Sequence, residues 1–144
     1  MTTATPPPVL EHTCEVALRP NDFDWAGHLN NSVYPQLLET GRWEWGLAHG
    51  VDAREDTVVA VVLQLQLDYL HAVDWDPVGR LVVRTSLADR TAYSFTLAQD
   101  VELPDGTKAA RGRVRLGLVD RLTKRVHRVD LDSMFDGGGS GSTA

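Results

Sequence analysis

The sequence contains one long stretch whose apolar residues have helical spacing, and most of the remaining chain shows the alternating apolar pattern of β-strands. This combination restricts the possible folds more than any other feature of the sequence. After Asn31, apolar residues and Gly41 recur every three or four positions as far as Ala48. That spacing predicts a helix with one buried face. His49 and Gly50 follow it, and they are typical of the end of a helix.

The sequence patterns on either side of this helix are those of strands. The expected strands cover residues 11–18, 57–69, 80–88, 94–103, 107–119 and 125–129. Pro104-Asp105-Gly106 is a turn sequence that joins two of them as a hairpin. Residues 130–135 are expected to add a helical turn. One helix with about five antiparallel strands predicts an α+β fold.

The predicted helix carries a glycine, Gly41, in its interior. Gly41 costs about 1 kcal/mol relative to alanine at such a position, so we expect close contact with a sheet at this point.

One helix covers only one face of the predicted sheet. The other face, or an edge strand, must be protected in another way. A homodimer is the economical solution.

Length and composition indicate a single globular domain. The 144 residues suit one domain, which we expect to span residues 11–135, with a flexible arm at 1–10 and a flexible Gly/Ser tail at 136–144. The net charge of −6 argues against non-specific nucleic-acid binding. The single cysteine, Cys14, is expected to be a buried structural thiol in a reducing compartment. We expect a cytoplasmic protein without a signal peptide or membrane span.

Polar residues concentrate just before the helix, in the segment that leads into it. Asp24, Gly27, His28, Asn30 and Asn31 all lie within eight positions. A helix start carries unpaired N–H groups and a partial positive charge, and Asn31 is a good N-cap type. A carboxylate beside such amides suits attack on a carbonyl carbon. The carboxylate then acts as nucleophile or as general base, and the residues leave both roles open.

The same segment carries a resemblance to a known family. The run DWAGHLNNSVY, from Asp24 to Tyr34, resembles the D-x-x-G-H-x-N-N-x-x-Y segment of the hotdog-fold thioesterases, the 4-hydroxybenzoyl-CoA thioesterase-like superfamily. LDYL at 67–70 and RTAYSF at 90–95 resemble later segments of that family, in the same order. The resemblance therefore covers roughly residues 11–131.

The resemblance implies a hotdog fold, in which one long helix is wrapped by an antiparallel sheet and the subunits form a homodimer or homotetramer. It implies hydrolysis of an acyl-CoA or acyl-carrier-protein thioester at the subunit interface, without cofactor or metal. By position, Asp24 would be the catalytic carboxylate and the amide near Asn31 would polarise the thioester carbonyl. The other site candidates are His28 for catalysis, and Gly27, Asn30, Tyr34, Tyr69, Ser94 and Arg113 for substrate binding.

Two residues depart from related patterns. Ala26 stands where plant-type acyl-carrier-protein thioesterases of similar appearance have Asn, which argues against their Asn-assisted mechanism. Pro35 follows Tyr34 early in the predicted helix and disfavours helical geometry in the residue before it. An irregular first turn is therefore expected.

Other charged residues have two interpretations. Asp22 is expected to be a solvated turn residue and is the reserve carboxylate. Glu39 is expected on a solvated helix face or in an ion pair with Arg42. The seven residues of the basic cluster form either a solvated strand face or a landing site for CoA phosphates or an acidic carrier protein. They are Arg111, Arg113, Arg115, Arg121, Lys124, Arg125 and Arg128.

Two further functions remain as alternatives. A hotdog dehydratase or hydratase ranks low, since the chain shows neither the H-F-P-G type of segment nor a paired Asp and His segment. A non-catalytic acyl-ligand binding or regulatory protein is the other alternative. The intact set of Asp24, Gly27, His28 and Asn31 favours an enzyme over a pure binder. The scattered histidines lack metal-ligand spacing, which predicts no metal site.

Overall fold

The computed structural model describes residues 9–51, 57–76 and 79–131 of the chain, and all statements below concern these residues. They form one α-helix, two short 3-10 helices and six strands. In chain order these are β1 (Val9–Ala17), η1 (Pro20–Asp22), η2 (Asn31–Val33), α1 (Tyr34–Ala48), β2 (Val58–Tyr69), β3 (Arg80–Arg90), β4 (Phe95–Glu102), β5 (Lys108–Asp120) and β6 (Val126–His127).

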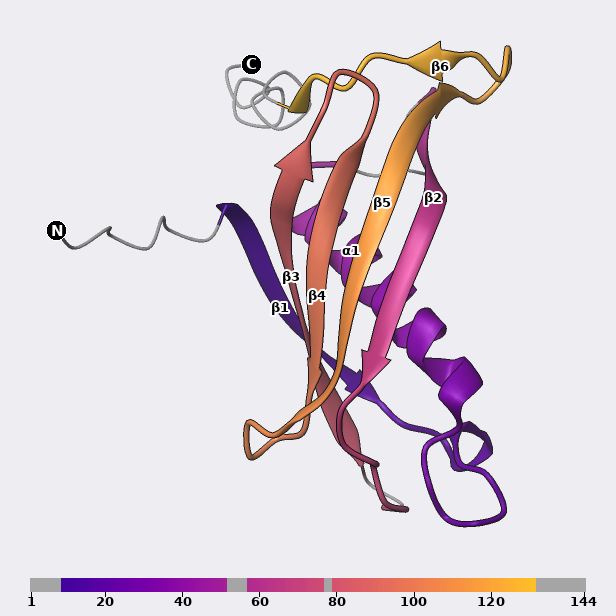
Figure 1. Cartoon of the computed structure of the whole chain (residues 1–144), viewed down its shortest axis with the longest axis vertical. Helices are drawn as coiled ribbons and strands as arrows, with labels where there is room; N and C mark the ends of the chain where they lie inside the picture. The colour runs from indigo at the N-terminus through magenta and orange to yellow at the C-terminus, as the bar shows by residue number, and fades with distance from the viewer. Residues whose placement is uncertain (1–8, 52–56, 77–78, 132–144) are drawn as a thin grey trace, which may run out of the picture.

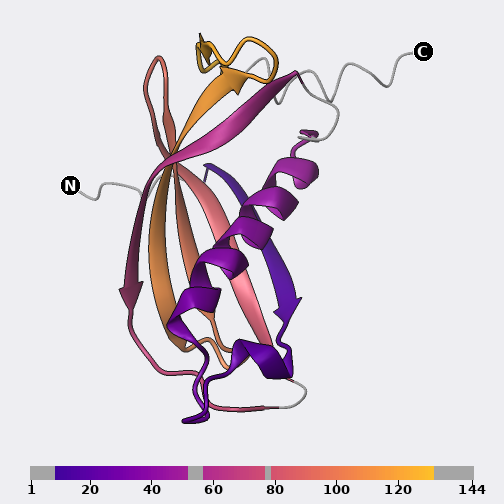
Figure 2. The same cartoon turned by 90° about the vertical axis from the view of Figure 1, so that its right-hand side faces the viewer.

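The strands form one antiparallel sheet with the order β1-β3-β4-β5-β2, and β6 pairs with β5. Figure 1 shows the strands side by side with α1 behind them, and Figure 2 shows α1 along the inner side of the curved sheet. The helix packs mainly against β1, β3 and β4. The core lies between α1 and this inner face, and Leu38, Leu81 and Val83 are completely buried there.

A glycine lets the helix lie close to the sheet. A Cβ atom at Gly41 would stand 2.4 Å from Val83 Cγ1 on β3. The backbone of α1 therefore approaches β3 more closely than any side chain at this position permits. The close contact expected at Gly41 is present, and it explains why the helix accepts an unfavourable residue.

A buried polar group also connects the helix to the sheet. Gln99 of β4 is 1% exposed. Its Nε2 donates to the Leu38 carbonyl of α1 and to Thr85 Oγ1 of β3, both at 2.9 Å. Arg42 Nη1 of α1 donates to Gln99 Oε1 at 3.2 Å. These bonds satisfy a side chain that would otherwise be costly to bury.

The outer edge strand β2 is long and apolar, and much of it faces solvent. It pairs with β5 on one side only, because it ends the sheet. Val62 and Leu63 are each 50% exposed. Leu65 pairs with Val114 across the ladder, yet it is more exposed than Val114, since α1 does not extend over β2. A long apolar edge of this kind is a template for pairing with another strand.

The predicted hotdog arrangement of one central helix and an antiparallel sheet is confirmed, and the short last strand expected at 125–129 is present as the two residues of β6. Every predicted strand is present within a few residues of its expected bounds. The first begins at Val9, inside the segment expected as an arm. Residues 1–8 and 136–144 lie outside the described residues, as does most of the helical turn expected at 130–135.

Candidate active site

The Asp24 carboxylate is held by the backbone of its own loop. Asp24 Oδ1 accepts the N–H of Ala26 at 2.9 Å and the N–H of His28 at 3.1 Å. The Asp24 N–H donates to the His28 carbonyl at 2.8 Å, and Gly27 has φ +85°, which favours glycine. One oxygen thus fixes the loop while the side chain stays exposed. The loop orients the carboxylate toward solvent, where a substrate can reach it.

This loop is fixed to the segment that follows β2. The Trp75 N–H donates to the Gly27 carbonyl at 2.8 Å, and the Phe23 and Trp75 rings meet edge to face with centroids 5.0 Å apart. His28 Nε2 lies 3.5 Å from Asp74 Oδ1. His28 is therefore directed at Asp74 and not at Asp24, whose contact with it is through the backbone. The sequence offered no signal for Asp74 or Trp75, because they lie about fifty positions from the loop.

The start of the helix differs from its prediction in one respect. Asn30, and not Asn31, is the N-cap of η2: its Oδ1 accepts the Ser32 N–H and the Ser32 hydroxyl, both at 3.0 Å. The N-cap of α1 itself is Val33, whose side chain makes no capping bond. The three residues after Asn30 form η2 before α1 begins at Tyr34. The irregular first turn expected from Pro35 is therefore present. The preference of Asn for caps therefore applies here to the short helix η2, and the expectation that Asn31 caps the long helix is wrong.

The Asn31 amide remains available to a ligand. Among the described residues, no acceptor receives the Asn31 N–H. The Asn30 N–H donates to the Asp22 carbonyl at 2.8 Å, which closes the loop that carries Asp24. The segment that carries the Asp24 carboxylate and the open Asn31 amide leads into α1 at the lower end of the molecule in Figure 1.

Two predicted substrate-binding tyrosines meet at this same end. The Tyr69 hydroxyl donates to the Asn31 carbonyl at 3.0 Å, and its ring meets the Tyr34 ring edge to face at 5.0 Å. Burial raises the pKa of the Tyr34 hydroxyl above its ordinary value, and Tyr69 adds to the rise. Tyr69 therefore ties the end of β2 to the start of α1, so the edge strand and the Asn31 amide are positioned together.

Asp22 corrects the prediction of a solvated turn residue. It is 4% exposed. Its Oδ2 accepts the Arg19 N–H at 2.7 Å, and its Oδ1 accepts Arg19 Nη2 at 3.0 Å. Both oxygens are thus used to hold the backbone ahead of the loop, and the nearby Asp24 is the accessible carboxylate.

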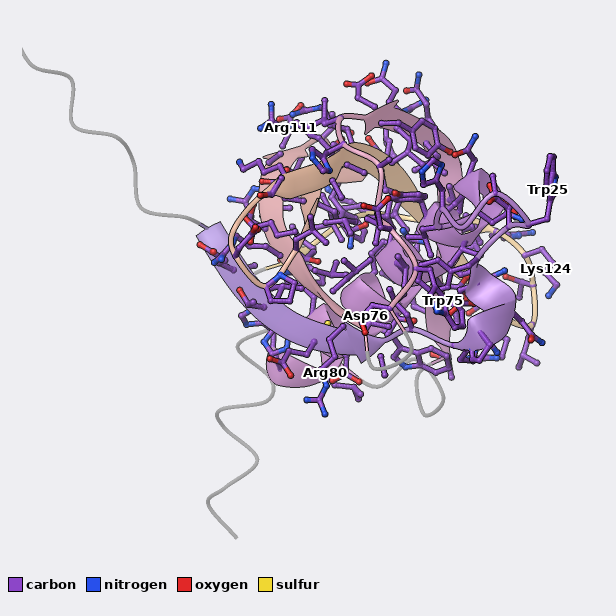
Figure 3. The ribbon with its side chains drawn as sticks, turned by 90° about the horizontal axis from the view of Figure 1, so that it is seen from below. Trp25, Trp75, Asp76, Arg80, Arg111 and Lys124 are labelled. Carbon is purple, nitrogen blue, oxygen red and sulfur yellow. The ribbon has the colours of Figure 1, made fainter. Side chains whose placement is uncertain are left out.

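Two predicted binding residues lie apart from Asp24 within one chain. Ser94 is buried before β4, and its Oγ lies 2.9 Å from Thr91 Oγ1 at the opposite end of the sheet. Arg113 is exposed on β5, on the sheet face that points away from α1. Figure 3 shows Arg111, from the same strand face, at the upper edge of the view and well apart from Trp25 at the right edge.

The predicted basic cluster divides into two groups. Arg111, Arg113 and Arg115 alternate with buried residues along β5 and share its outer face. Arg111 Nε lies 3.3 Å from Asp100 Oδ1, so part of this group is already paired. The other four basic residues follow β5 in the turn before β6 and beyond. They do not form one continuous landing surface with the arginines in the middle of the strand.

A cavity of about 400 Å³ lies between the second half of α1 and the β2 end of the sheet. Trp45, Phe95 and Leu97 give it apolar walls, while Glu39 and Arg42 are its charged residues. Sequence patterns did not predict this cavity, because its lining comes from separate elements. The lining consists of Glu39, Arg42, Trp43, Trp45, Gly46, Val51, Val58, Val59, Ala60, Val62, Phe95, Leu97, Leu116, Leu118 and Leu131.

The described residues contain neither a cluster of metal-ligating side chains nor a helix that could span a membrane. No three His, Cys, Asp or Glu side chains lie close enough together in the described part of the chain to hold a metal ion. The only α-helix there, α1, has 15 residues, and no helix of the described segments is long and apolar enough to cross a bilayer.

Comparison with solved structures shows several similar chains. PA2801 of Pseudomonas aeruginosa, a candidate thioesterase, is 27% identical, with a TM-score of 0.77 over 88% of this chain and 96% of its own. Slr0204, a 1,4-dihydroxy-2-naphthoyl-CoA thioesterase from Synechocystis, is 12% identical, with a TM-score of 0.76 over 88% and 96%. SAV2348 from Staphylococcus aureus, solved with CoA, is 16% identical, with a TM-score of 0.75 over 97% and 87%.

Sequence comparison adds the family. No curated protein matches the chain significantly. The family model of the thioesterase-like superfamily matches residues 18–135, which include the Asp24 loop, the whole of α1 and strands β2 to β6. That match covers most of the chain and agrees with the fold of the similar structures, so the chain belongs to the thioesterase-like superfamily.

Proposed function

We propose that this protein hydrolyses an acyl-CoA or acyl-carrier-protein thioester to the free acid and the thiol. The observation that carries the proposal is the Asp24 loop, which presents an exposed carboxylate on the segment that leads to the open Asn31 amide. Membership of the thioesterase-like superfamily supports it. Slr0204, a CoA thioesterase, and SAV2348, solved with CoA, have the same fold.

The proposed reaction assigns one role to each group. The Asn31 N–H binds the thioester oxygen, which becomes negative when the carbonyl carbon is attacked. Either Asp24 attacks that carbon to form an anhydride that water then cleaves, or Asp24 takes a proton from the water that attacks. The C–S bond breaks in both routes, and the thiolate that leaves takes its proton from solvent in the first route and from the protonated Asp24 in the second. Gly27 shapes the loop, and His28 holds it through its side-chain contact with Asp74.

We further propose that the site is completed by a second subunit. Antiparallel pairing of two β2 strands about their midpoint would put the Tyr69 end of one strand beside the Val58 end of the other. The Tyr69 end is bonded to Asn31, and the Val58 end lines the cavity. The Asp24 loop of one subunit would then face the cavity of its partner. In that arrangement the cavity would receive the acyl group while Asp24 acts on its thioester.

The test is thiol release from a panel of aliphatic and aromatic acyl-CoAs, with acylated carrier protein assayed in parallel. We expect turnover by the wild-type protein and a loss of at least about a hundredfold in kcat for Asp24→Asn, the scale of losing a main catalytic group. The amide retains an oxygen for the Ala26 and His28 amides, so the loop should keep its conformation.

Each other outcome has a distinct meaning. Equal activity of wild type and Asp24→Asn would remove Asp24 from the mechanism while leaving the reaction in place. Binding without thiol release from any CoA or carrier-protein ester would identify the protein as a non-catalytic acyl-ligand binder.

A further inference from the structure

The cavity beneath α1 contains a cation among apolar walls. Arg42 lines it together with Trp43, Trp45 and Phe95. Burial lowers the pKa of the Arg42 guanidinium from its ordinary value, and the nearby Glu39 charge opposes that shift. Desolvating a guanidinium is costly unless acceptors replace the lost water. An arginine in such a place therefore needs a partner or a ligand.

Most of the Arg42 donors have no acceptor among the residues that the structure describes. A guanidinium has five N–H groups. Among the described residues Arg42 makes one hydrogen bond, from Nη1 to Gln99 Oε1, and no carboxylate lies within ion-pair distance of it. Glu39 thus influences Arg42 only through space. The remaining donors of a cavity-lining side chain are available to a molecule in the cavity.

A hydrogen bond to Gln99 of the sheet fixes the position of the Arg42 guanidinium. Gln99 is almost completely buried, and its amide nitrogen is held by the Leu38 carbonyl and by Thr85. The Gln99 oxygen is consequently a stationary acceptor beneath the helix. A guanidinium anchored at one nitrogen loses less freedom when it binds a ligand with the others, which favours specific recognition.

We propose that Arg42 is a specificity-determining residue that binds an oxygen carried by the acyl group at a distance from its thioester. The occupant is an acyl chain with an apolar body and a hydroxyl or carboxylate oxygen toward its far end. This inference rests on the proposed function, because it assumes that the cavity receives the acyl group. A plain alkyl group would leave desolvated donors unpaired, and sites built for a hydrogen bond reject such ligands.

The experiment measures binding without turnover. The probes are three thioethers of N-acetylcysteamine, which mimic the end shared by CoA and carrier protein. They carry an octyl chain, an 8-hydroxyoctyl chain or a 7-carboxyheptyl chain. Titration calorimetry gives each Kd, and quenching of the cavity tryptophans Trp43 and Trp45 reports occupancy of the cavity. We expect the hydroxyl or the carboxylate probe to bind at least about tenfold more tightly than the octyl probe.

Substitutions separate recognition from a merely structural role. Arg42→Met should abolish the preference, so that the ratio of Kd values falls to about one, and Arg42→Lys should restore part of it. Arg84→Met is the matched control, because Arg84 pairs with Glu11 and Glu102 on the sheet, outside the cavity lining. It should leave the ratio unchanged. If Arg42 had only a structural role, Arg42→Met would weaken the binding of all three probes equally, and the ratio of their Kd values would stay as in the wild-type protein.

The remaining outcomes contradict the inference. Tighter binding of the octyl probe, or no binding of any probe to the wild-type protein, would overturn it. A preference that persists in Arg42→Met would assign the recognition to another group. Absence of hydrolysis with an intact preference would overturn the proposed function and leave the specificity assignment in place, so the two failures are distinguishable.

Discussion

At the scale of single residues, two aspartates two positions apart have opposite roles. Asp22 is buried, and both of its oxygens are bonded to Arg19. Asp24 is exposed, and only Oδ1 is used by the protein. Sequence alone presents both as candidate carboxylates. Their surroundings make Asp22 a structural group and leave Asp24 as the group that can meet a substrate.

A prediction about Asp22 follows from this difference. Asp22→Ala should lower the free energy of unfolding by about 1–3 kcal/mol, because it removes two acceptors from Arg19. Asp22→Asn should cost less, since one acceptor oxygen remains. Denaturant titration measures both, and thiol release per folded molecule should stay near wild type. A large fall in kcat for Asp22→Asn with unchanged stability would instead make Asp22 catalytic.

At the scale of elements, the position of α1 depends on a small residue facing β3. A Cβ at Gly41 would collide with Val83, whereas a Cβ at Gly46 would meet only ordinary contacts, the nearest being the Val51 carbonyl at 3.5 Å. Close packing therefore requires a glycine at position 41, whereas it does not require one at position 46. Only the one at position 41 sets the distance between helix and sheet.

These two positions give a matched pair of variants. Gly41→Ala should lower the free energy of unfolding by about 1 kcal/mol or more, because overpacking outweighs the gain in helix propensity. Gly46→Ala should be neutral or stabilising by up to about 1 kcal/mol. Thermal unfolding of both variants checks the order. Equal or higher stability of Gly41→Ala would show that β3 yields easily at this contact.

At the scale of the whole molecule, the apolar edge of β2 is the feature on which the proposed dimer rests. It exposes Val62, Leu63 and Leu65, and soluble proteins seldom leave such an edge open. Pairing two β2 strands would continue the sheet across both subunits. The dimer proposed above uses this edge and accounts for its composition.

A substitution at this edge tests the dimer. Leu65→Lys should shift the protein toward the monomer, since it would place a charged ammonium group from each subunit in the apolar interface close to the two-fold axis. Leu122→Lys is the control, because Leu122 is 84% exposed in the turn before β6. Sedimentation velocity over a concentration series measures both variants. An unchanged mass for Leu65→Lys would place the interface elsewhere.

A mixing experiment tests whether the site spans two subunits. Gly46→Trp should fill the cavity and Asp24→Asn should remove the carboxylate, so each homodimer is inactive. Mixed dimers would carry one intact site, and a random mixture should recover roughly a quarter of wild-type activity. The recovered thiol release is measured after co-expression. If Asp24 acts on the cavity of its own subunit, the mixture should remain inactive.

The sequence by itself determined the element order of this protein. Local spacing placed α1 and every strand, and the turn at 104–106 placed the β4–β5 hairpin, because periodicity of apolar residues is a local property of the chain. The cluster of polar residues in the segment from Asp24 to Tyr34 is likewise visible in the order of residues along the chain. The family resemblance rested on that same local segment, and the family match confirmed it.

The tertiary structure decided what depends on distant residues. It made Asn30, and not Asn31, the capping residue and placed it before η2, buried Asp22 against Arg19, and tied the Asp24 loop to Asp74 and Trp75. It also created the cavity. No local pattern contains these facts, because burial and hydrogen bonding depend on which segments the fold brings together, and the sheet order is set by packing across the whole chain.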